Sequence, residues 1–368
     1  MQLSIKNITS FLETIAPIAL QEDYDNAGLL IGNDNEVCTG ILISLDCTEA
    51  IIQEAIDKNC NMVVAHHPII FKGLKKINGK NYVERTIIKA IKNDIAIYAI
   101  HTNLDNVLQG VSHKMGEKLG LENIKILAPK NNLLQKLIVF CPVENAAKLT
   151  KALHEAGAGN IGNYHNCSFT YTGIGVFTPG PNANPKKGEI GITDSSEEHK
   201  IEVIFPKWLQ SNIIKTMKEN HPYEEVAYDI LSIENYFENV GSGIVGNLPN
   251  AVTEKEFLNI LGAVFTQKLI KHTSFTGKMV QKIALCGGSG SFLINAAKAA
   301  GADVYVTADV KYHEFFDADE QLLLADIGHY ESEQYTIELL FELLSNKFPN
   351  FALQKTGINT NPVQYFVS

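Results

Sequence analysis

Three pairs of polar residues in this 368-residue chain combine the residue types that bind divalent metal ions. They are His66 with His67, His101 with Asp105, and His329 with Glu333. Imidazole nitrogen and carboxylate oxygen are the ligands that zinc and other first-row divalent ions take in proteins. The three pairs therefore raise the hypothesis of a metal centre.

The spacing within the pairs favours convergence on two ions. His329 and Glu333 are four residues apart at the start of a predicted helix, so both face one side, and the carboxylate could bridge two ions. His66 and His67 would face opposite sides of a regular strand, but Pro68 ends that strand, and at a turn the two rings can splay toward neighbouring ions. The ligands would leave coordination positions open for water or substrate, as in a catalytic site.

Each pair also has a structural interpretation. A His-His-Pro segment is often only a turn, and His329 with Glu333 could be a solvated pair on a helix. His101 and Asp105 could form a hydrogen-bond network in a loop. The metal hypothesis depends on the three pairs occurring together at the ends of predicted strands.

The elements that must position these residues follow a βαβ pattern. Short runs rich in Ile and Val alternate with helical patterns over residues 40–120, and the pattern returns over residues 282–344. It predicts an α/β fold with a mainly parallel sheet. Functional groups in such sheets collect at the carboxyl ends of strands, which is where all three pairs lie.

The pattern changes between these two halves. Here the apolar runs predict the order strand, helix, strand, strand, helix, strand, which is the ferredoxin-like split βαβ arrangement. We therefore expect an inserted ferredoxin-like α+β domain at residues 130–240, within a larger α/β domain made of residues 1–129 and 241–368. The glycine-rich segment 238–251 is expected to be the return linker.

Two further segments of the larger domain could add polar groups to the cleft. The segment "CGGSGS" at residues 286–291 follows a predicted strand and could offer backbone N–H groups to a phosphate, although a tight glycine turn is the favoured interpretation. Asp309, Lys311 and His313 follow another strand and could line the same cleft.

The predicted insert has a polar segment of its own. In "HPYEEVAYD", His221, Glu224 and Glu225 are expected at a solvated corner between a helix and a strand, in preference to a second metal site.

Composition disfavours several classes of function. The formal net charge of -10 disfavours nucleic-acid binding, which requires clustered Lys and Arg. The six cysteines form no C-x-x-C pair, which fits reduced thiols. No stretch reaches the ~20 apolar residues of a membrane span. We expect a cytoplasmic protein with no membrane partner.

Several motifs, taken together, resemble the GTP cyclohydrolase 1 type 2 homologue family, also called Nif-three-like proteins. They occur in order through both halves of the larger domain: "EDYDNAGLLIG", "LDCTEAIIQEA", "VVAHHPIIFKGLKKI", "HTNLDN", "CGGSGSFLINAAKAAGADVYVTADVKYH" and "GHYESE". The resemblance implies an α/β domain with a central sheet and a ring-shaped homohexamer. It also implies two divalent metal ions per subunit, such as zinc, iron or manganese. In the longer bacterial members it implies an inserted domain that resembles PII and CutA.

The resemblance also assigns roles to individual residues. The metal ligands of the family fall on five positions of this chain: His66, His67, Asp105, His329 and Glu333. His101 matches a position close to the metals, where it would support a ligand or act in catalysis. The chain has Ala308 where glycine is expected and Tyr24 where tryptophan is common, and neither is a ligand position.

The family name refers to opening of the imidazole ring of GTP with loss of formate. Two divalent ions can activate water for attack on C8 of the purine, while His101 or a carboxylate shuttles protons, and the same groups could hydrolyse a phosphoester. We therefore expect a metal-dependent hydrolase of a small, nucleotide-like substrate. The alternatives are a non-catalytic, metal-binding regulatory or metal-handling hexamer and, against the acidic charge, a nucleic-acid-binding protein.

Overall fold

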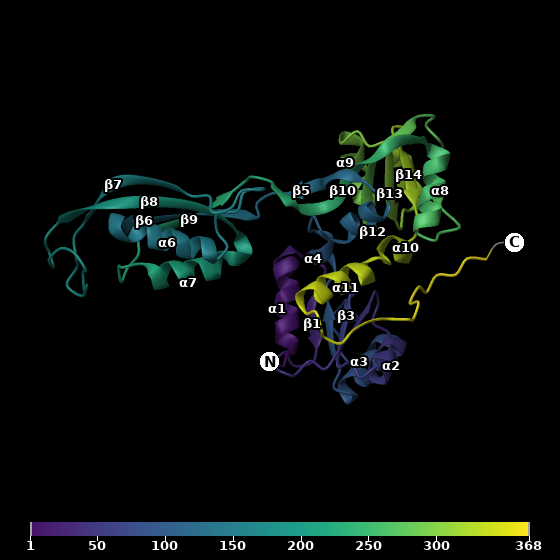
Figure 1. Cartoon of the computed structure of the whole chain (residues 1–368), viewed down its shortest axis with the longest axis horizontal. Helices are drawn as coiled ribbons and strands as arrows, with labels where there is room; N and C mark the ends of the chain where they lie inside the picture. Colours follow the sequence, from purple (N-terminus) through teal and green to yellow (C-terminus); the bar gives the residue numbers. More distant parts are fainter. Residues whose placement is uncertain (1, 367–368) are drawn as a thin grey trace. The chain divides into compact units, whose positions relative to one another are not determined.

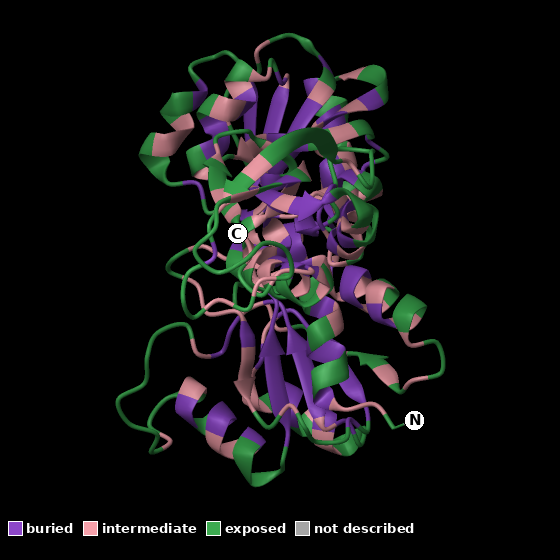
Figure 2. Cartoon of the chain, turned by 90° about the vertical axis from the view of Figure 1, so that its left-hand side faces the viewer, coloured by how far each residue is buried: buried purple, intermediate pink, exposed green. Residues whose placement is uncertain are grey.

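The computed structural model describes residues 2–366, which form two compact units (Figure 1). Unit 2 is Pro129–Glu238, and unit 1 consists of the segments before and after it. Figure 2 shows that the buried residues of unit 1 concentrate in the strands of its sheets. Each unit is a mixed α/β structure with its own hydrophobic core.

The first sheet of unit 1 has five strands. In spatial order they are β1 (Gly28–Ile31), β4 (Ala96–Ala99), β3 (Met62–Ala65), β2 (Ile41–Ser44) and β15 (Leu353–Lys355). All of them run parallel except β1, which is antiparallel to β4. Every residue of β2, β3 and β4 is buried, which explains their continuous apolar runs, since both faces of the sheet are covered.

Four helices cover the two faces of the first sheet. Helices α1 (Ile5–Ile15) and α11 (Thr336–Lys347) pack on one face, and α2 (Glu49–Asp57) and α3 (Tyr82–Lys92) pack on the other. This arrangement makes β2-α2-β3 and β3-α3-β4 the βαβ units that the sequence predicts.

The second sheet of unit 1 has six strands. In spatial order they are β11 (Lys271–His272), β14 (Leu323–Asp326), β13 (Val304–Ala308), β12 (Met279–Ser289), β10 (Phe237–Thr253) and β5 (Glu122–Lys130). Strands β12, β13 and β14 are parallel, whereas β10 and β11 are antiparallel to their neighbours β12 and β14.

The remaining helical elements of unit 1 connect the strands or pack on the second sheet. They are η1 (Ile18–Leu20), α4 (Thr102–Asp105), α5 (Val111–Lys118), α8 (Glu254–Val264), η3 (Ser291–Leu293), α9 (Ile294–Ala299), η4 (Tyr312–Ala318) and α10 (His329–Glu333). Helix α8 packs on one face of the second sheet and α9 on the other.

Two expectations from the sequence are wrong. Unit 1 has two sheets where one central sheet was expected. The expected linker at 238–251 lies within strand β10, which pairs with β12. Its glycines serve close packing: a Cβ on Gly243 would lie 2.9 Å from the Leu285 carbonyl oxygen, and one on Gly246 would lie 3.1 Å from that of Glu122.

Unit 2 contains one antiparallel sheet covered by two helices. The strands, in spatial order, are β7 (Phe169–Phe177), β8 (Asp194–Pro206), β6 (Leu134–Pro142) and β9 (Tyr228–Ile233). Helices α6 (Val143–Glu155) and α7 (Gln210–Asn220) share a core with β6 and β8, and the short η2 (Lys207–Leu209) precedes α7. The chain order is therefore βαββαβ.

Within residues 2–366, no helix is both long and apolar enough to cross a membrane.

Candidate metal centre

Two neighbouring strands of the first sheet deliver the first polar residues of the site. Strands β3 and β4 are parallel and in register, with Ala65 beside Ala99, so the residues that follow them leave the same sheet edge. His66 and His67 follow β3 directly, and His101 precedes the short helix α4, which ends at Asp105. We expected Asp105 in a loop, but it lies in a helical turn, which brings its carboxylate toward His66.

Helix α10 delivers the other two residues. It follows β14 of the second sheet, carries His329 at its first position and Glu333 at its last, and packs against β12. Gly328 enters the helix with φ of +89°, a conformation that favours glycine. The i, i+4 spacing places both side chains on one face, as predicted, and the His329 Nε2 atom lies 3.1 Å from Oε2 of Glu333.

Three atoms form the inner half of the site: His66 Nε2, Asp105 Oδ1 and Glu333 Oε1. The His66 nitrogen lies 3.7 Å from the Asp105 oxygen and 3.8 Å from the Glu333 oxygen, beyond hydrogen-bond distance. Both His66 Nε2 and Asp105 Oδ1 are buried without a hydrogen-bond partner. Ligands that share an ion at 2.0–2.2 Å are separated by about this distance, so the gap fits a metal ion.

The tautomer of His66 is fixed by its other nitrogen. His66 Nδ1 lies 2.8 Å from the Ile100 carbonyl oxygen, which can only accept a hydrogen bond, so Nδ1 carries the proton. The Nε2 atom therefore directs a lone pair at two carboxylates. Burial lowers the pKa of His66, which keeps that lone pair unprotonated. A cation among these three atoms would satisfy all of them.

Three other atoms form the outer half: His67 Nε2, His329 Nε2 and Glu333 Oε2. The carboxylate oxygen lies 2.9 Å from the His67 nitrogen and 3.1 Å from the His329 nitrogen, and the two nitrogens are 3.4 Å apart. The side chains of His67 and His329 are 21% and 40% exposed, whereas that of His66 is fully buried. Glu333 thus directs one oxygen into each half.

Three histidines are oriented by carboxylates on their Nδ1 side. Asp46 lies 2.8 Å from His67, Asp309 lies 2.6 Å from His329, and Asp25 lies 2.7 Å from His101. A carboxylate that accepts the Nδ1 proton fixes the ring and presents Nε2 to a metal. Sequence reasoning missed Asp25 and Asp46. Asp46 follows β2 at the same sheet edge as His66, which was the available signal, whereas nothing in the pattern indicated Asp25.

These contacts set the charges of the site. Burial works against protonation, but the hydrogen bonds that His67 donates to Asp46 and Glu333 raise its pKa to about 10. Against the same effect of burial, Asp309 and Glu333 raise the pKa of His329 to about 11. Burial would raise the pKa of Glu333, but its histidine neighbours hold that pKa well below its usual range. Burial, followed by the charge of Glu333, raises the pKa of Asp105.

Two overlapping groups in the described residues could hold a metal ion. One is His66, His67 and His101, and the other is His67, His329 and Glu333, and in each group the ligand atoms lie within 4.8 Å of one another. The ring of His101 lies edge-on to those of His66 and His67, with centroids 5.2 and 5.4 Å apart. All six residues singled out from the sequence therefore lie at one place in unit 1.

The glycine-rich segment after β12 packs against Glu333. Gly288 has φ of +61°, and a Cβ there would lie 2.3 Å from Oε1 of Glu333. Its N–H donates to the hydroxyl of Ser332, at 2.9 Å. The geometry supports the glycine-turn interpretation, since the turn makes room for the central carboxylate.

The other polar segments have mixed outcomes. Asp309 lies at the site, but Lys311 pairs with Glu314 at 3.9 Å, and His313 packs edge-on against Tyr312. His221 was expected at a solvated corner, and this is wrong for its side chain. It is buried, with Nε2 2.9 Å from the Phe140 carbonyl oxygen and Nδ1 accepting a backbone N–H.

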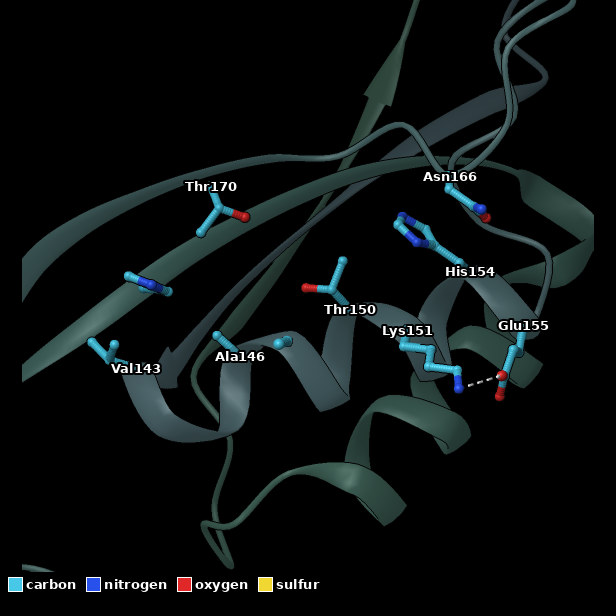
Figure 3. A pocket seen from close by; sticks show the side chains of 10 residues that line it. Val143, Ala146, Thr150, Lys151, His154, Glu155, Asn166 and Thr170 are labelled. Atoms are coloured by element: carbon cyan, nitrogen blue, oxygen red, sulfur yellow. Dashed lines mark ion pairs between the residues drawn. The ribbon is translucent and has the colours of Figure 1, made fainter.

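A cavity of about 600 Å³ opens beside the outer half. Asp46, His67, Asp309 and His329 line one side of it, together with Tyr330. A second cavity, of about 580 Å³, lies in unit 2 between α6 and strands β7 and β8 (Figure 3). Of the residues that line this second cavity, none belongs to either metal-capable group. The cavity of unit 1 is therefore the one that adjoins the candidate metal ligands.

Comparisons with known proteins agree with one another. The chain matches the model of the Duf34/NIF3 (NGG1p interacting factor 3) family over residues 3–362. It is 40% identical over 327 residues to the GTP cyclohydrolase 1 type 2 homolog of Bacillus subtilis, covering 88% of each chain. The homolog of Halalkalibacterium halodurans is 36% identical over 365 residues, covering 98% of each.

Solved structures show the same fold along the whole chain. A Bacillus cereus protein related to NIF3 aligns with a TM-score of 0.86 and 38% identity, covering 100% of both chains. The Staphylococcus aureus protein SA1388 aligns with a TM-score of 0.79 and 30% identity, covering 99% of both. This chain belongs to the Duf34/NIF3 family.

Proposed function

We propose that this protein binds two divalent metal ions side by side and uses them to hydrolyse a small, nucleotide-like substrate. The inner ion would be held by His66, Asp105 and Glu333, and the outer ion by His67, His329 and Glu333. The observation that carries the proposal is the pair of buried, unpartnered atoms His66 Nε2 and Asp105 Oδ1, which face each other at 3.7 Å. Without a cation, two acceptors would be buried against each other at a cost.

The surrounding residues would supply the rest of the chemistry. When bound, a pair of ions such as zinc, iron or manganese activates water and neutralises negative charge on a substrate. His101 lies beside His66 and His67 and is oriented by Asp25, so its Nε2 could take or give a proton. The cavity of about 600 Å³ beside the outer half would hold the substrate, with Tyr330 and Tyr365 in its wall. The names of the relatives, GTP cyclohydrolase 1 type 2 homolog, motivate the nucleotide-like substrate.

A turnover screen tests the catalytic part. Wild type and His67→Ala, purified without chelator, would be compared for metal content and for release of formate or phosphate from nucleotides and other phosphoesters. We expect metal-dependent turnover that falls at least ~100-fold in the variant, since removal of a ligand disrupts one ion of the pair. Full activity of metal-free protein would refute the hydrolase. Metal without turnover of any substrate would instead support the regulatory or metal-handling alternative.

We propose further that unit 2 is an inserted ferredoxin-like domain of the PII and CutA type. The supporting observations are its βαββαβ order, its strand order β7-β8-β6-β9, and a core of its own. Expression of residues 129–238 alone tests this proposal, which predicts a cooperatively folding protein.

The ring-shaped homohexamer stays a proposal that rests on family membership, together with the cytoplasmic location. Exposed aromatic side chains on unit 1, such as Phe292, Tyr312 and Phe316, are consistent with surfaces that an assembly would cover. Light scattering of the purified chain tests the assembly and predicts six copies.

A further inference from the structure

Residues 356–365, which we call the strap, follow β15 and reach the metal centre. In Figure 1 they belong to the yellow segment that follows α11. The beginning of the strap is anchored to the first sheet and to α2. Thr356 N–H donates to the Ile43 carbonyl at 2.9 Å, and Gly357 N–H donates to Glu54 at 2.8 Å.

Two side chains then tie the strap to the outer half. The hydroxyl of Thr360 donates to Oδ2 of Asp46 at 2.5 Å, and the other oxygen of Asp46 lies 2.8 Å from Nδ1 of His67. The Asn361 amide donates to Glu331 at 2.9 Å, on the same helix as His329. The strap thus contacts the helix that carries His329 and the carboxylate that lies behind His67.

The strap also has a defined course beyond Thr360. The Asn359 side chain accepts the N–H of Asn361 at 2.8 Å, and the Asn361 side chain accepts that of Val363 at 2.9 Å. These local turns direct Pro362, Val363 and Tyr365 into the wall of the cavity beside the outer half.

We infer that Thr360 is a positioning residue for the outer ion, acting through Asp46 on His67. This inference rests on the proposed metal pair. A carboxylate that accepts a proton from an imidazole must be held itself, and Thr360 is the side chain that holds Asp46 on its second oxygen. The one histidine of the proposed inner set, His66, is held by a backbone carbonyl, so the strap would act on one ion of the pair.

The chain offers a matched set of variants. Thr360→Val keeps the shape and removes the hydroxyl, and Thr360→Ser restores the hydroxyl. Thr178→Val is the control, because it removes a remote hydrogen bond of similar geometry, to Thr193 at 2.9 Å in unit 2. All three would be made in the full chain, and their thermal midpoints without metal would be compared to confirm equal folding.

The test is titration of each protein with zinc against a competing chelator. We expect two ions in wild type and, in Thr360→Val, a roughly threefold to tenfold weaker outer ion, less than the 10–100-fold loss when a ligand's direct partner is removed. Thr360→Ser should recover the affinity, and Thr178→Val should leave both ions unchanged.

The outcomes separate the two claims. If wild type takes up two ions and Thr360→Val binds both with the same affinities, the role of Thr360 is overturned and the metal pair is left intact. Wild type that takes up fewer than two ions refutes the metal pair and this inference with it. Equal weakening by Thr360→Val and Thr360→Ser also overturns the inference, because the hydroxyl would then not be the group that acts.

Discussion

The inner and outer halves of the site differ in the spacing of their candidate ligand atoms. In the inner half, His66 Nε2 stands 3.7 and 3.8 Å from its carboxylate neighbours, buried and unpartnered. In the outer half, the three atoms lie 2.9–3.4 Å apart, and Oε2 of Glu333 can accept hydrogen bonds from both Nε2 atoms. The spacing of the inner half suits an ion without rearrangement, whereas the atoms of the outer half would have to move apart. In both halves an ion would compete with protons, which the raised pKa values of Asp105, His67 and His329 favour.

The two halves also differ in access. His66 is fully buried, whereas His67 and His329 are partly exposed and line the cavity. For the proposed metal pair, we therefore expect the inner ion to be the more tightly held, and the outer ion to be the one that would exchange and meet a substrate.

Glu333→Gln should abolish the distinction by removing both ions. Glu333 is the one residue of the proposed set that contributes to both halves, and an amide offers a single neutral oxygen as a ligand. The bound metal, measured by elemental analysis, should fall from two ions per chain to about zero. Glu36→Gln, at an exposed position of unit 1, is the control and should keep both ions. Retention of one tightly bound ion in Glu333→Gln would show that the halves are independent.

Asp46→Asn should weaken the outer ion selectively. Asn can still hydrogen-bond His67 but no longer supplies the negative charge that makes its Nε2 a strong ligand. We expect a 10–100-fold loss of affinity for the outer ion and little change for the inner one, measured by chelator competition. Asp34→Asn, at an exposed ion pair with Lys6, is the control. An equal loss at both ions would contradict the separation.

Gly288→Ala should lower the free energy of unfolding by more than the strain of its positive φ alone would cause. The new Cβ would meet Oε1 of Glu333 at 2.3 Å, so we expect about 1–3 kcal/mol of overpacking in addition to the backbone strain at positive φ. Gly120→Ala is the matched control, because Gly120 has φ of +68° with nothing within 4 Å. Denaturant unfolding of both variants without metal isolates the clash, and equal losses would refute it.

The smallest effect is expected on thermal stability, from Glu84. This residue lies in the first turn of α3 and holds the segment between His67 and that helix. Hydrogen bonds from the backbone N–H groups of Asn78 and Lys80 lower the pKa of Glu84. Its contribution to stability is therefore present above the ordinary carboxyl pKa and is lost as pH falls through the lowered value. The thermal midpoint of Glu84→Gln should lie below that of wild type at pH 7, and the gap should narrow as pH falls below the ordinary carboxyl pKa of about 4.3. A gap that is independent of pH would contradict this role.

The sequence predicted those parts of the molecule that depend on local pattern. The βαβ runs predicted that His66, His67 and His329 follow strands, and the shared edge of β3 and β4 explains why His66 and His67 lie beside His101. His329 follows β14 of the second sheet, so a shared sheet edge does not account for its contact with His67. The split into two sheets did not follow from the pattern, because each half of unit 1 repeats the same pattern. Strand β10 was missed because glycines that serve close packing look the same as glycines of a linker.

The supporting contacts were out of reach for a different reason. Thr360 and Asp46 are separated by 314 residues, and Asp25 reaches His101 from a segment without regular structure. Only the fold determines which of the chain's many carboxylates lies behind a given imidazole. A strand-end position indicated Asp46 in principle, but no periodicity marks Asp25 or Thr360.

Stepwise removal of metal from the intact chain tests the central claim most directly. Protein purified without chelator would be treated with increasing chelator while native mass spectrometry counts the ions per chain. We predict two ions in the starting protein and a one-ion species that resists chelator. His67→Ala should start as this resistant species, whereas any single ion in His66→Ala should be lost readily. A chain that holds no ion, or that loses both in a single step regardless of these substitutions, would contradict the account of an inner and an outer site.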